Sequence, residues 1–299
     1  MAKSQYEYVK SFEQDRTLLP KTWMVVRVDG RGFSSFVKKH GWEKPVDERG
    51  AQVMEGAARR VIEALPEVVM GYGHSDEFSF VFPPSATLFS RREIKIVSTL
   101  ASMFTAGFIM EWGELFADLP LASPPIFDAR AVLFPSTAIL RDYLAWRQVD
   151  CHINNLINTG FWALVHDGVP RDEASEIMAS LDSGGKNELL YSRFGINYNN
   201  EPERNRKGSA WVRVIVEGTK TDNYGNTRAD IRRDLVLLHT DMIKDVFWEQ
   251  HPYILQDIPL AERKRAFNKA LKKKNKNKNK NKQEEEKGGG SVGASSDGR

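Results

Sequence analysis

The feature that most constrains the fold is a pair of short β-prone runs joined by a tight turn. Residues 68–72 and 78–82 are rich in β-branched and aromatic side chains. The segment between them, Gly-His-Ser-Asp-Glu at 73–77, has the residue types of a turn. The three phenylalanines of the second run alternate, so they share one face. The pattern predicts a β-hairpin with one buried face and with Asp76 and Glu77 at its turn.

A further apolar run, residues 23–28, predicts a strand that ends at Asp29-Gly30. If this strand lies beside the hairpin, Asp29 and Asp76 converge at one end of a sheet. Two carboxylates at such a short separation repel each other, and a divalent cation relieves the repulsion. Mg²⁺ prefers a few carboxylates together with phosphate oxygens. The pattern is that of a polymerase palm, and this arrangement is the one used in two-metal phosphoryl and nucleotidyl transfer. The alternative is that Asp29-Gly30 and Ser75-Asp76 are only turn residues.

The remaining periodicities predict an α/β (α+β) fold, in which helices flank an antiparallel sheet. Helices are expected at 5–16, 33–37, 47–65, 91–112, 136–164, 171–181 and 241–247, and strands at 127–134 and 210–216. The helix at 91–112 has a basic first turn, which opposes the helix dipole and predicts an anionic partner. Asparagines in the middle of the 136–164 helix indicate either a functional role for this segment or a break near 151–155. We expect a catalytic domain at 1–135, a C-terminal part at 136–271 that completes the fold, and a tail at 272–299.

Composition excludes several other classes of site. The single cysteine, Cys151, excludes an internal disulfide and is expected to be a buried apolar residue. No cluster of His and Cys suggests zinc, and neither a Gly-x-x-x-x-Gly-Lys loop nor a Gly-x-Ser-x-Gly elbow is present. No apolar run reaches about 18 residues, so no membrane partner is expected. His74 is interpreted as exposed and idle, with a proton shuttle as the alternative. Most of the aromatic residues Trp146, Phe161 and Trp162 are expected to pack in the core, with stacking on bases as the alternative.

The net charge of +3 conceals an acidic body. Residues 263–282 hold eleven Lys or Arg and no acid, and subtracting these charges leaves −8 for the rest of the chain. The Lys-Asn alternation at 272–282 and the Gly/Ser-rich end cannot bury apolar area, so the tail is expected to be disordered. It either adds nonspecific RNA affinity or is a tolerated extension. A cytoplasmic location is expected, with a nuclear pool as an alternative because the run is lysine-rich.

Five segments resemble the tRNA-His guanylyltransferase family. They are VVRVDGRGF (25–33), GYGHSDEFSFVF (71–82), FDARAVLFPS (127–136), LAWRQVDCHINNLINTGFWAL (144–164) and KNELLYSRFGINYNN (186–200). They occur in the family's order and cover roughly residues 5–250. The combination of DGR, HSDE and HINN is the most specific part.

The resemblance implies an enzyme that adds a guanosine to the 5′ end of tRNA-His. ATP first adenylylates the 5′-monophosphate, the 3′-hydroxyl of GTP then attacks and displaces AMP, and pyrophosphate is removed. The family's cofactor is Mg²⁺, two ions per subunit, and its members are usually homotetramers. The alternatives are a template-dependent 5′-end repair polymerase, a palm-domain nucleotide cyclase without a tRNA, and a catalytically silent RNA-binding protein. The HINN and KNE segments count against the cyclase, and the intact Asp29 and Asp76 count against the silent protein.

The resemblance also implies roles for single residues. Asp29 and Asp76 match metal-binding carboxylates, Gly30 matches a backbone carbonyl ligand, and Glu77 matches a third catalytic acid. The nucleotide-binding set is Asp29, Gly30, Arg31, Gly32, Phe33, Ser34, Lys44, Ser75, Asp76 and Asn158. The set expected to bind triphosphate or tRNA is Arg27, Arg92, Lys95, Arg130, His152, Asn155 and Lys186. Ser34 and Ser35 stand where the family often has His and Arg, so two phosphate contacts of the family are absent.

Deleting residues 272–299 is expected to weaken tRNA binding at low salt, because fewer counterions are released from the RNA. Turnover at saturating tRNA is expected to stay nearly unchanged. Binding at two salt concentrations and turnover at saturating tRNA are the measurements. A large loss of saturated turnover would contradict the prediction.

Overall fold

The structure is a computed structural model that describes residues 4–221, 227–257, 262, 265 and 269. It divides into two compact units, residues 1–213 with 235–257 and residues 214–234 with 258–299. The site described below lies in the first unit. The tail expected to be disordered, 272–299, lies outside the described residues, and the domain limits at 135 and 271 stay predictions.

The described residues form one six-stranded sheet in the order β4-β1-β3-β2-β5-β6. The strands are β1 (Trp23–Gly30), β2 (Met70–His74), β3 (Glu77–Phe82), β4 (Phe127–Phe134), β5 (Ser209–Thr221) and β6 (Thr227–Leu238). β1 pairs antiparallel with β3 and β4, and β2 pairs antiparallel with β3 and β5. The prediction of an antiparallel sheet flanked by helices is confirmed.

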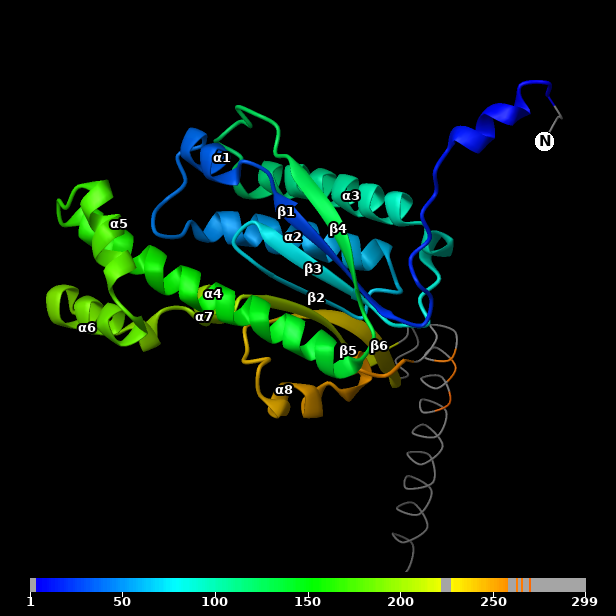
Figure 1. Cartoon of the computed structure of the whole chain (residues 1–299). Helices are drawn as coiled ribbons and strands as arrows, with labels where there is room; N and C mark the ends of the chain where they lie inside the picture. Colours follow the sequence, from blue (N-terminus) through cyan, green and yellow to red (C-terminus); the bar gives the residue numbers. More distant parts are fainter. Residues whose placement is uncertain (1–3, 222–226, 258–261, 263–264, 266–268, 270–299) are drawn as a thin grey trace, which may run out of the picture. The chain divides into compact units, whose positions relative to one another are not determined.

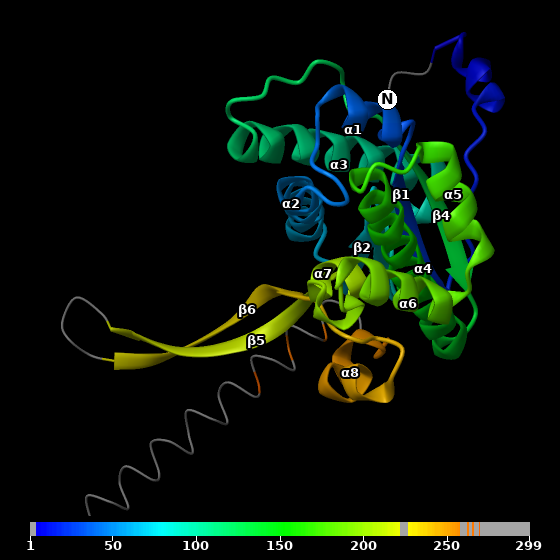
Figure 2. The same cartoon turned by 90° about the vertical axis from the view of Figure 1, so that its left-hand side faces the viewer.

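Helices cover both faces of the sheet (Figure 1). The longer helices are α1 (Phe33–Lys39), α2 (Glu48–Ala64), α3 (Glu93–Leu115), α4 (Thr137–His166), α5 (Arg171–Ser180) and α6 (Ser183–Phe194), followed by the short α7 (Glu203–Lys207) and α8 (Asp245–Gln250). Short 3₁₀ helices lie at Glu7–Phe12, Leu88–Arg91, Tyr198–Asn200 and Pro252–Ile254. α2 and α3 lie on one face and α4 on the other, as the second view confirms (Figure 2).

The main core lies between the sheet and the α2–α3 layer. Phe78, Phe80 and Phe82 of β3 are almost completely buried there, as their alternation predicts. They pack in one cluster with apolar residues of α2 and α3, including Val53 and Phe104. At about 25 cal/mol per Å² of apolar surface buried, such aromatic residues contribute much of the driving force for folding.

The predicted N-terminal caps of two helices are confirmed, whereas the break expected in the second helix is absent. Asp47 caps α2 by accepting a hydrogen bond from the Arg49 backbone N–H, and Ser136 caps α4 by accepting one from the Ile139 N–H. The predicted break in α4 does not occur. Asn155 is buried there, but its side-chain amide donates to the Tyr198 hydroxyl at 3.0 Å, so the helix need not open to satisfy it.

Three element limits are corrected. α3 begins at Glu93, so its first turn is acidic and the expected anionic partner is not needed. Arg91 precedes the helix, where its buried guanidinium donates to the carbonyls of Leu18, Ala86 and Thr22. The N-terminal helix is the shorter 3₁₀ segment Glu7–Phe12, and α8 begins at Asp245 rather than at residue 241.

By length and composition alone, α3 is the one helix of the described chain that could cross a membrane. A core helix passes the same test, and α3 buries Leu100, Phe104 and Phe108 against α2 and the sheet. The absence of a membrane partner stays a prediction.

Replacing Phe80 by Ala is expected to lower the free energy of unfolding by about 3–5 kcal/mol, because it leaves a cavity in the main core. Phe12→Ala is the matched control, since Phe12 is 76% exposed and should change stability by less than about 0.5 kcal/mol. Chemical denaturation of both variants tests the core, and equal effects would contradict it.

Candidate functional site

The end of β1 meets the turn of the β2–β3 hairpin. Asp29 is paired in register with Glu77 of β3 and with Asp128 of β4. The backbone N–H of Gly30 donates to the Asp76 carbonyl at 3.0 Å. Asp29 and Asp76 therefore lie at one end of the sheet. One detail differs from the sequence prediction: the turn contains only Ser75 and Asp76, and Glu77 is the first residue of β3.

The contact between β1 and the turn requires a glycine. A Cβ atom on Gly30 would lie 2.9 Å from both Cβ and Oδ2 of Asp76. Ser75 has a positive φ of 51°, and its hydroxyl donates to Asp76 Oδ1 at 3.2 Å. This tight turn holds the Asp76 carboxylate against Gly30, and any side chain at position 30 would displace it.

The two carboxylates influence each other. Burial raises the pKa of Asp76 above its ordinary value, and the negative charge of Asp29 raises it further. Among the described residues, no group of three or more His, Cys, Asp or Glu forms a complete metal cage. Two carboxylates that share a phosphate-accessible end of a sheet fit Mg²⁺ instead, because Mg²⁺ binds through one or two carboxylates and takes its other ligands from water and phosphate.

Glu77 belongs to a separate network of charged groups. Arg147 of α4 donates to its two carboxylate oxygens at 3.2 and 3.0 Å, and His74 Nε2 lies 3.1 Å from Oε1. Arg27 lies between Glu77 and Asp29, at 3.8 and 3.5 Å. Burial alone would raise the pKa of Glu77, but His74, Arg147 and Arg27 hold it below its ordinary value. Glu77 thus acts on the site indirectly, by holding Arg27 beside Asp29. The interpretation of His74 as exposed and idle is wrong, because its ring is buried beside Glu77.

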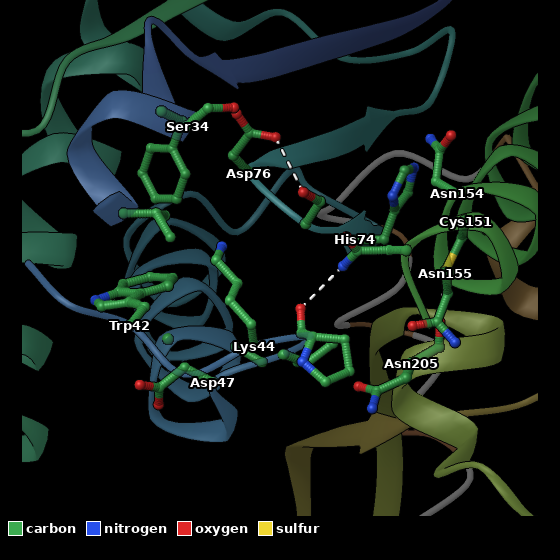
Figure 3. Close-up of a pocket in the computed structure, with 18 of the residues that line it drawn as sticks. Ser34, Trp42, Lys44, Asp47, His74, Asp76, Cys151, Asn154, Asn155 and Asn205 are labelled. Atoms are coloured by element: carbon green, nitrogen blue, oxygen red, sulfur yellow. Dashed lines mark hydrogen bonds between the residues drawn. The ribbon is translucent and has the colours of Figure 1, made fainter. Parts of the chain in front are cut away.

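A cleft of about 1030 Å³ opens beside the turn. Figure 3 shows Ser34, Trp42 and Asp76 on one side and Cys151 and Asn155 of α4 on the other. The Lys44 side chain extends into the space between them. The Asn158 side-chain amide donates to the Pro45 carbonyl at 2.9 Å and so ties the Lys44 loop to α4. The cleft is large enough for more than one drug-sized ligand.

The cleft gathers part of the sequence-predicted set. The members that line it are Phe33, Ser34, Lys44, Ser75, Asp76, Glu77, Asn155 and Asn158. Asp29 and Gly30 are the last residues of β1, and Arg31 and Gly32 connect it to α1, with a positive φ of 64° at Gly32. Phe33 packs against Phe36 and Trp42, so it belongs to the core as much as to the cleft.

The rest of the predicted set lies elsewhere. Arg92 pairs with Asp15, and it follows Arg91, which donates to the Thr22 carbonyl just before β1 begins. Because β1 then extends for roughly 20 Å, Arg92 and Lys95 are far from Asp29. Other members of the set are also held outside the cleft. Arg130 pairs with Asp128, Lys186 donates to the Leu181 carbonyl, and His152 is exposed beside Tyr198.

The structure also brings in residues that sequence reasoning missed, above all Arg147. It lies on the buried face of α4 with Leu140, Leu144 and Cys151. A charged residue at this spacing signals a buried acid partner, and that signal was present in the sequence. Cys151 is buried as expected, and burial raises the pKa of its thiol to about 12.

Comparison with known proteins gives consistent matches along the chain. A family model described as tRNAHis guanylyltransferase matches residues 6–135, and one described as Thg1 C terminal domain matches residues 138–291. The tRNA(His) guanylyltransferase of Neurospora crassa is 47% identical over 286 residues, which cover 87% of this chain and 98% of that protein. That of Schizosaccharomyces pombe is 47% identical over 257 residues, covering 85% and 98%.

Solved structures agree with these matches. The crystal structure of tRNA(His) guanylyltransferase from Saccharomyces cerevisiae aligns with a TM-score of 0.67 at 38% identity, covering 69% of this chain and 92% of that one. A bacterial tRNA(His) guanylyltransferase-like protein in complex with ATP aligns with a TM-score of 0.65 at 22% identity, covering 85% and 100%. At that identity the bacterial protein supports the fold alone.

Replacing Asp76 by Asn is expected to stabilise the protein at neutral pH in the presence of a chelator. The folded-state pKa of Asp76 is raised, so the wild type loses stability as pH rises from the ordinary value of 3.8 through the raised value. The variant lacks this loss. Its advantage should therefore shrink as the pH is lowered through the raised value towards 3.8, which denaturation at several pH values measures. A variant less stable than the wild type at pH 7 would contradict the expected repulsion.

Proposed function

Because this chain belongs to the tRNAHis guanylyltransferase family, we propose that it adds a guanosine nucleotide to the 5′ end of tRNA-His. The observation that carries the proposal is the meeting of Asp29 and Asp76 at one sheet end, beside a cleft of nucleotide size. The family match supports the reaction, and the geometry supports this end of the cleft as its location.

The reaction proposed has three steps at phosphorus. An oxygen of the tRNA 5′-phosphate attacks the α-phosphorus of ATP, and pyrophosphate leaves. The 3′-hydroxyl of GTP then attacks the adenylylated 5′-phosphate, its proton is lost, and AMP leaves. Water finally attacks the α-phosphorus of the added GTP, the bond between its α- and β-phosphates breaks, and the β- and γ-phosphates leave as pyrophosphate. All three steps place negative charge at one site, which therefore needs compensating positive charge.

Asp29, Asp76 and the Gly30 carbonyl are the groups that would hold two Mg²⁺ ions, which supply charge neutralisation and a lower pKa for the attacking hydroxyl. The protein's own contribution is positional. The Gly30–Asp76 contact keeps one carboxylate at the cleft, and Arg27 keeps Asp29 beside Glu77. The backbone of residues 30–32, with two glycines, can approach a triphosphate closely.

Other residues of the cleft have proposed roles in binding. Lys44 supplies a positive charge to a bound phosphate. Asn158 positions Lys44 by donating a hydrogen bond to the carbonyl of the next residue, Pro45. Arg92, Lys95, Arg130, His152 and Lys186 are proposed, from the family resemblance, to contact the tRNA rather than the nucleotide in this cleft. Assembly into a homotetramer is likewise a proposal. The exposed apolar side chains along α4 are available for a contact between copies: Ile139, Trp146, Val149, Ile153 and Ile157.

Replacing Asp29 or Asp76 by Ala is expected to lower guanylylation by at least about a thousandfold, because the charge on the reacting phosphates is no longer compensated. The assay incubates 5′-monophosphorylated tRNA-His with ATP, labelled GTP and Mg²⁺, with tRNA-Phe as the substrate control. Asp142→Ala is the matched protein control, since Asp142 is an exposed residue of α4 outside the cleft.

The expected result is label in tRNA-His with the wild type and with Asp142→Ala only. Circular dichroism shows whether the inactive variants are folded. Retained activity of Asp29→Ala or Asp76→Ala would remove the assignment of these carboxylates. Equal labelling of tRNA-Phe would indicate a 5′-end repair polymerase instead.

A further inference from the structure

Besides the carboxylate end, the cleft has a cationic region, where the Lys44 loop meets α4 and α5. The Nζ atom of Lys44 lies 5.9 Å from the centroid of the Trp162 ring, and the Cζ atom of Arg171 lies 5.1 Å from it. These distances put the two charges at most about 11 Å apart. All three side chains line the cleft, so Trp162 is not the core residue that its sequence context predicted.

No described carboxylate forms an ion pair with either cation. In the described part of the chain, Lys44 and Arg171 form no ion pair and no side-chain hydrogen bond. The negative charge of Asp47 acts on Lys44 and raises its pKa slightly, but the Asp47 carboxylate is already occupied by other donors. It receives Arg49 Nη2 at 2.9 Å and the backbone N–H groups of Glu43 and Arg49 at 3.2 and 3.1 Å. Within the residues that the structure describes, the positive charge at this end of the cleft is therefore compensated only in part, by the negative charge of Asp47 acting on Lys44.

The position of these charges is unfavourable in the free protein. Two like charges within about one Debye length repel each other at 0.1 M salt. Burial lowers the pKa of Lys44, and the charge of Arg171 lowers it further. Arg171 is also the first residue of α5, where a cation opposes the helix dipole. Its placement thus contributes nothing to the stability of the helix, and a bound anion would offset all three costs.

We propose that Lys44, Arg171 and Trp162 form a phosphate-binding subsite in which the protein's own cations neutralise the ligand. The proposal rests on the function proposed above and adds Arg171 and Trp162 to it. The guanidinium presents a planar fork of donors to phosphate oxygens, and the lysine adds a point charge. The indole ring, in contact with both cations, limits water on one side and restricts their positions.

This subsite differs from the carboxylate end of the cleft in its need for metal. Asp29 and Asp76 repel phosphate unless a cation intervenes. The Lys44–Arg171 pair attracts it directly. Phosphate binding here consequently persists when divalent ions are removed. The phosphate has two possible sources, the polyphosphate chain of a nucleotide and the 5′-phosphate of the tRNA, and the shared chemistry is that of a phosphate anion.

The test compares Arg171→Gln, Arg171→Lys and Trp162→Leu in the full-length protein with EDTA present. One arm measures the Kd of ATP and of inorganic triphosphate. The other measures the Kd of 5′-monophosphorylated and 5′-hydroxyl tRNA-His. Arg193→Gln is the matched control, because Arg193 also lies beside an aromatic ring, 5.4 Å from Phe194, but pairs with Asp167 outside the cleft.

Arg171→Gln is expected to weaken phosphate binding about tenfold, as the loss of one charge-assisted contact does. Arg171→Lys should recover only part of the binding, because lysine restores the charge but not the planar fork of donors. Trp162→Leu should bind with an affinity between those of Arg171→Gln and the wild type, and Arg193→Gln should match the wild type. A change in the ATP and triphosphate arm assigns the subsite to a nucleotide. Loss of the difference between the two tRNAs assigns it to the 5′ end of the RNA.

The proposal is overturned if Arg171→Gln binds every probe as tightly as the wild type, or if Arg193→Gln loses as much. It is also overturned if the wild type binds none of the probes without a divalent ion. Guanylylation by the wild type separates this failure from that of the proposed function. If the wild type is active and Arg171→Gln binds phosphate as tightly as the wild type, only the subsite is disproved. If the wild type is inactive in guanylylation, the proposed function is disproved.

Discussion

The contact between the end of β1 and the hairpin turn determines the geometry of the whole site. Gly30 donates its N–H to the Asp76 carbonyl, and its missing side chain leaves room for the Asp76 carboxylate. Two acids are thereby held together in a place where burial and mutual repulsion both raise the pKa of Asp76. Such an arrangement is costly by itself. It becomes favourable when a cation or a cation-bound phosphate is present. The repulsion between the two carboxylates therefore favours the binding of cations and of phosphates that carry them.

The sheet makes this possible because its two faces have opposite character. Phe78 of β3 faces the α2–α3 layer, whereas Glu77 and Ser79 lie on the face covered by α4. There Arg147 binds Glu77, and the Tyr143 hydroxyl lies 3.0 Å from Ser79. The apolar face holds the strands in place. The polar face connects the hairpin to α4, the helix that forms the opposite side of the cleft, so the carboxylate end and the phosphate subsite share one rigid support.

The predicted elements that depend on local pattern are largely correct. The alternation of phenylalanines fixed the face of β3, and the caps at Asp47 and Ser136 fixed the starts of α2 and α4. Predictions that depended on single charged residues were less successful. Arg91 was assigned to the first turn of α3, but its guanidinium satisfies three backbone carbonyls before that helix begins. A sequence cannot show which carbonyls are left unpaired, since their partners come from distant segments.

The sequence by itself determined the antiparallel sheet, the position of the hairpin and the family, because periodicity and motif order are properties of neighbouring residues. Only the tertiary structure decided which charges meet. It placed His74 and Arg147 on Glu77, separated Arg92 from Asp29 by the length of a strand, and brought Lys44 to Arg171. The physical reason is that electrostatic interactions act through space over a few ångströms. Their partners are therefore set by the packing of α4 against the sheet and of α5 against α4, and not by spacing along the chain.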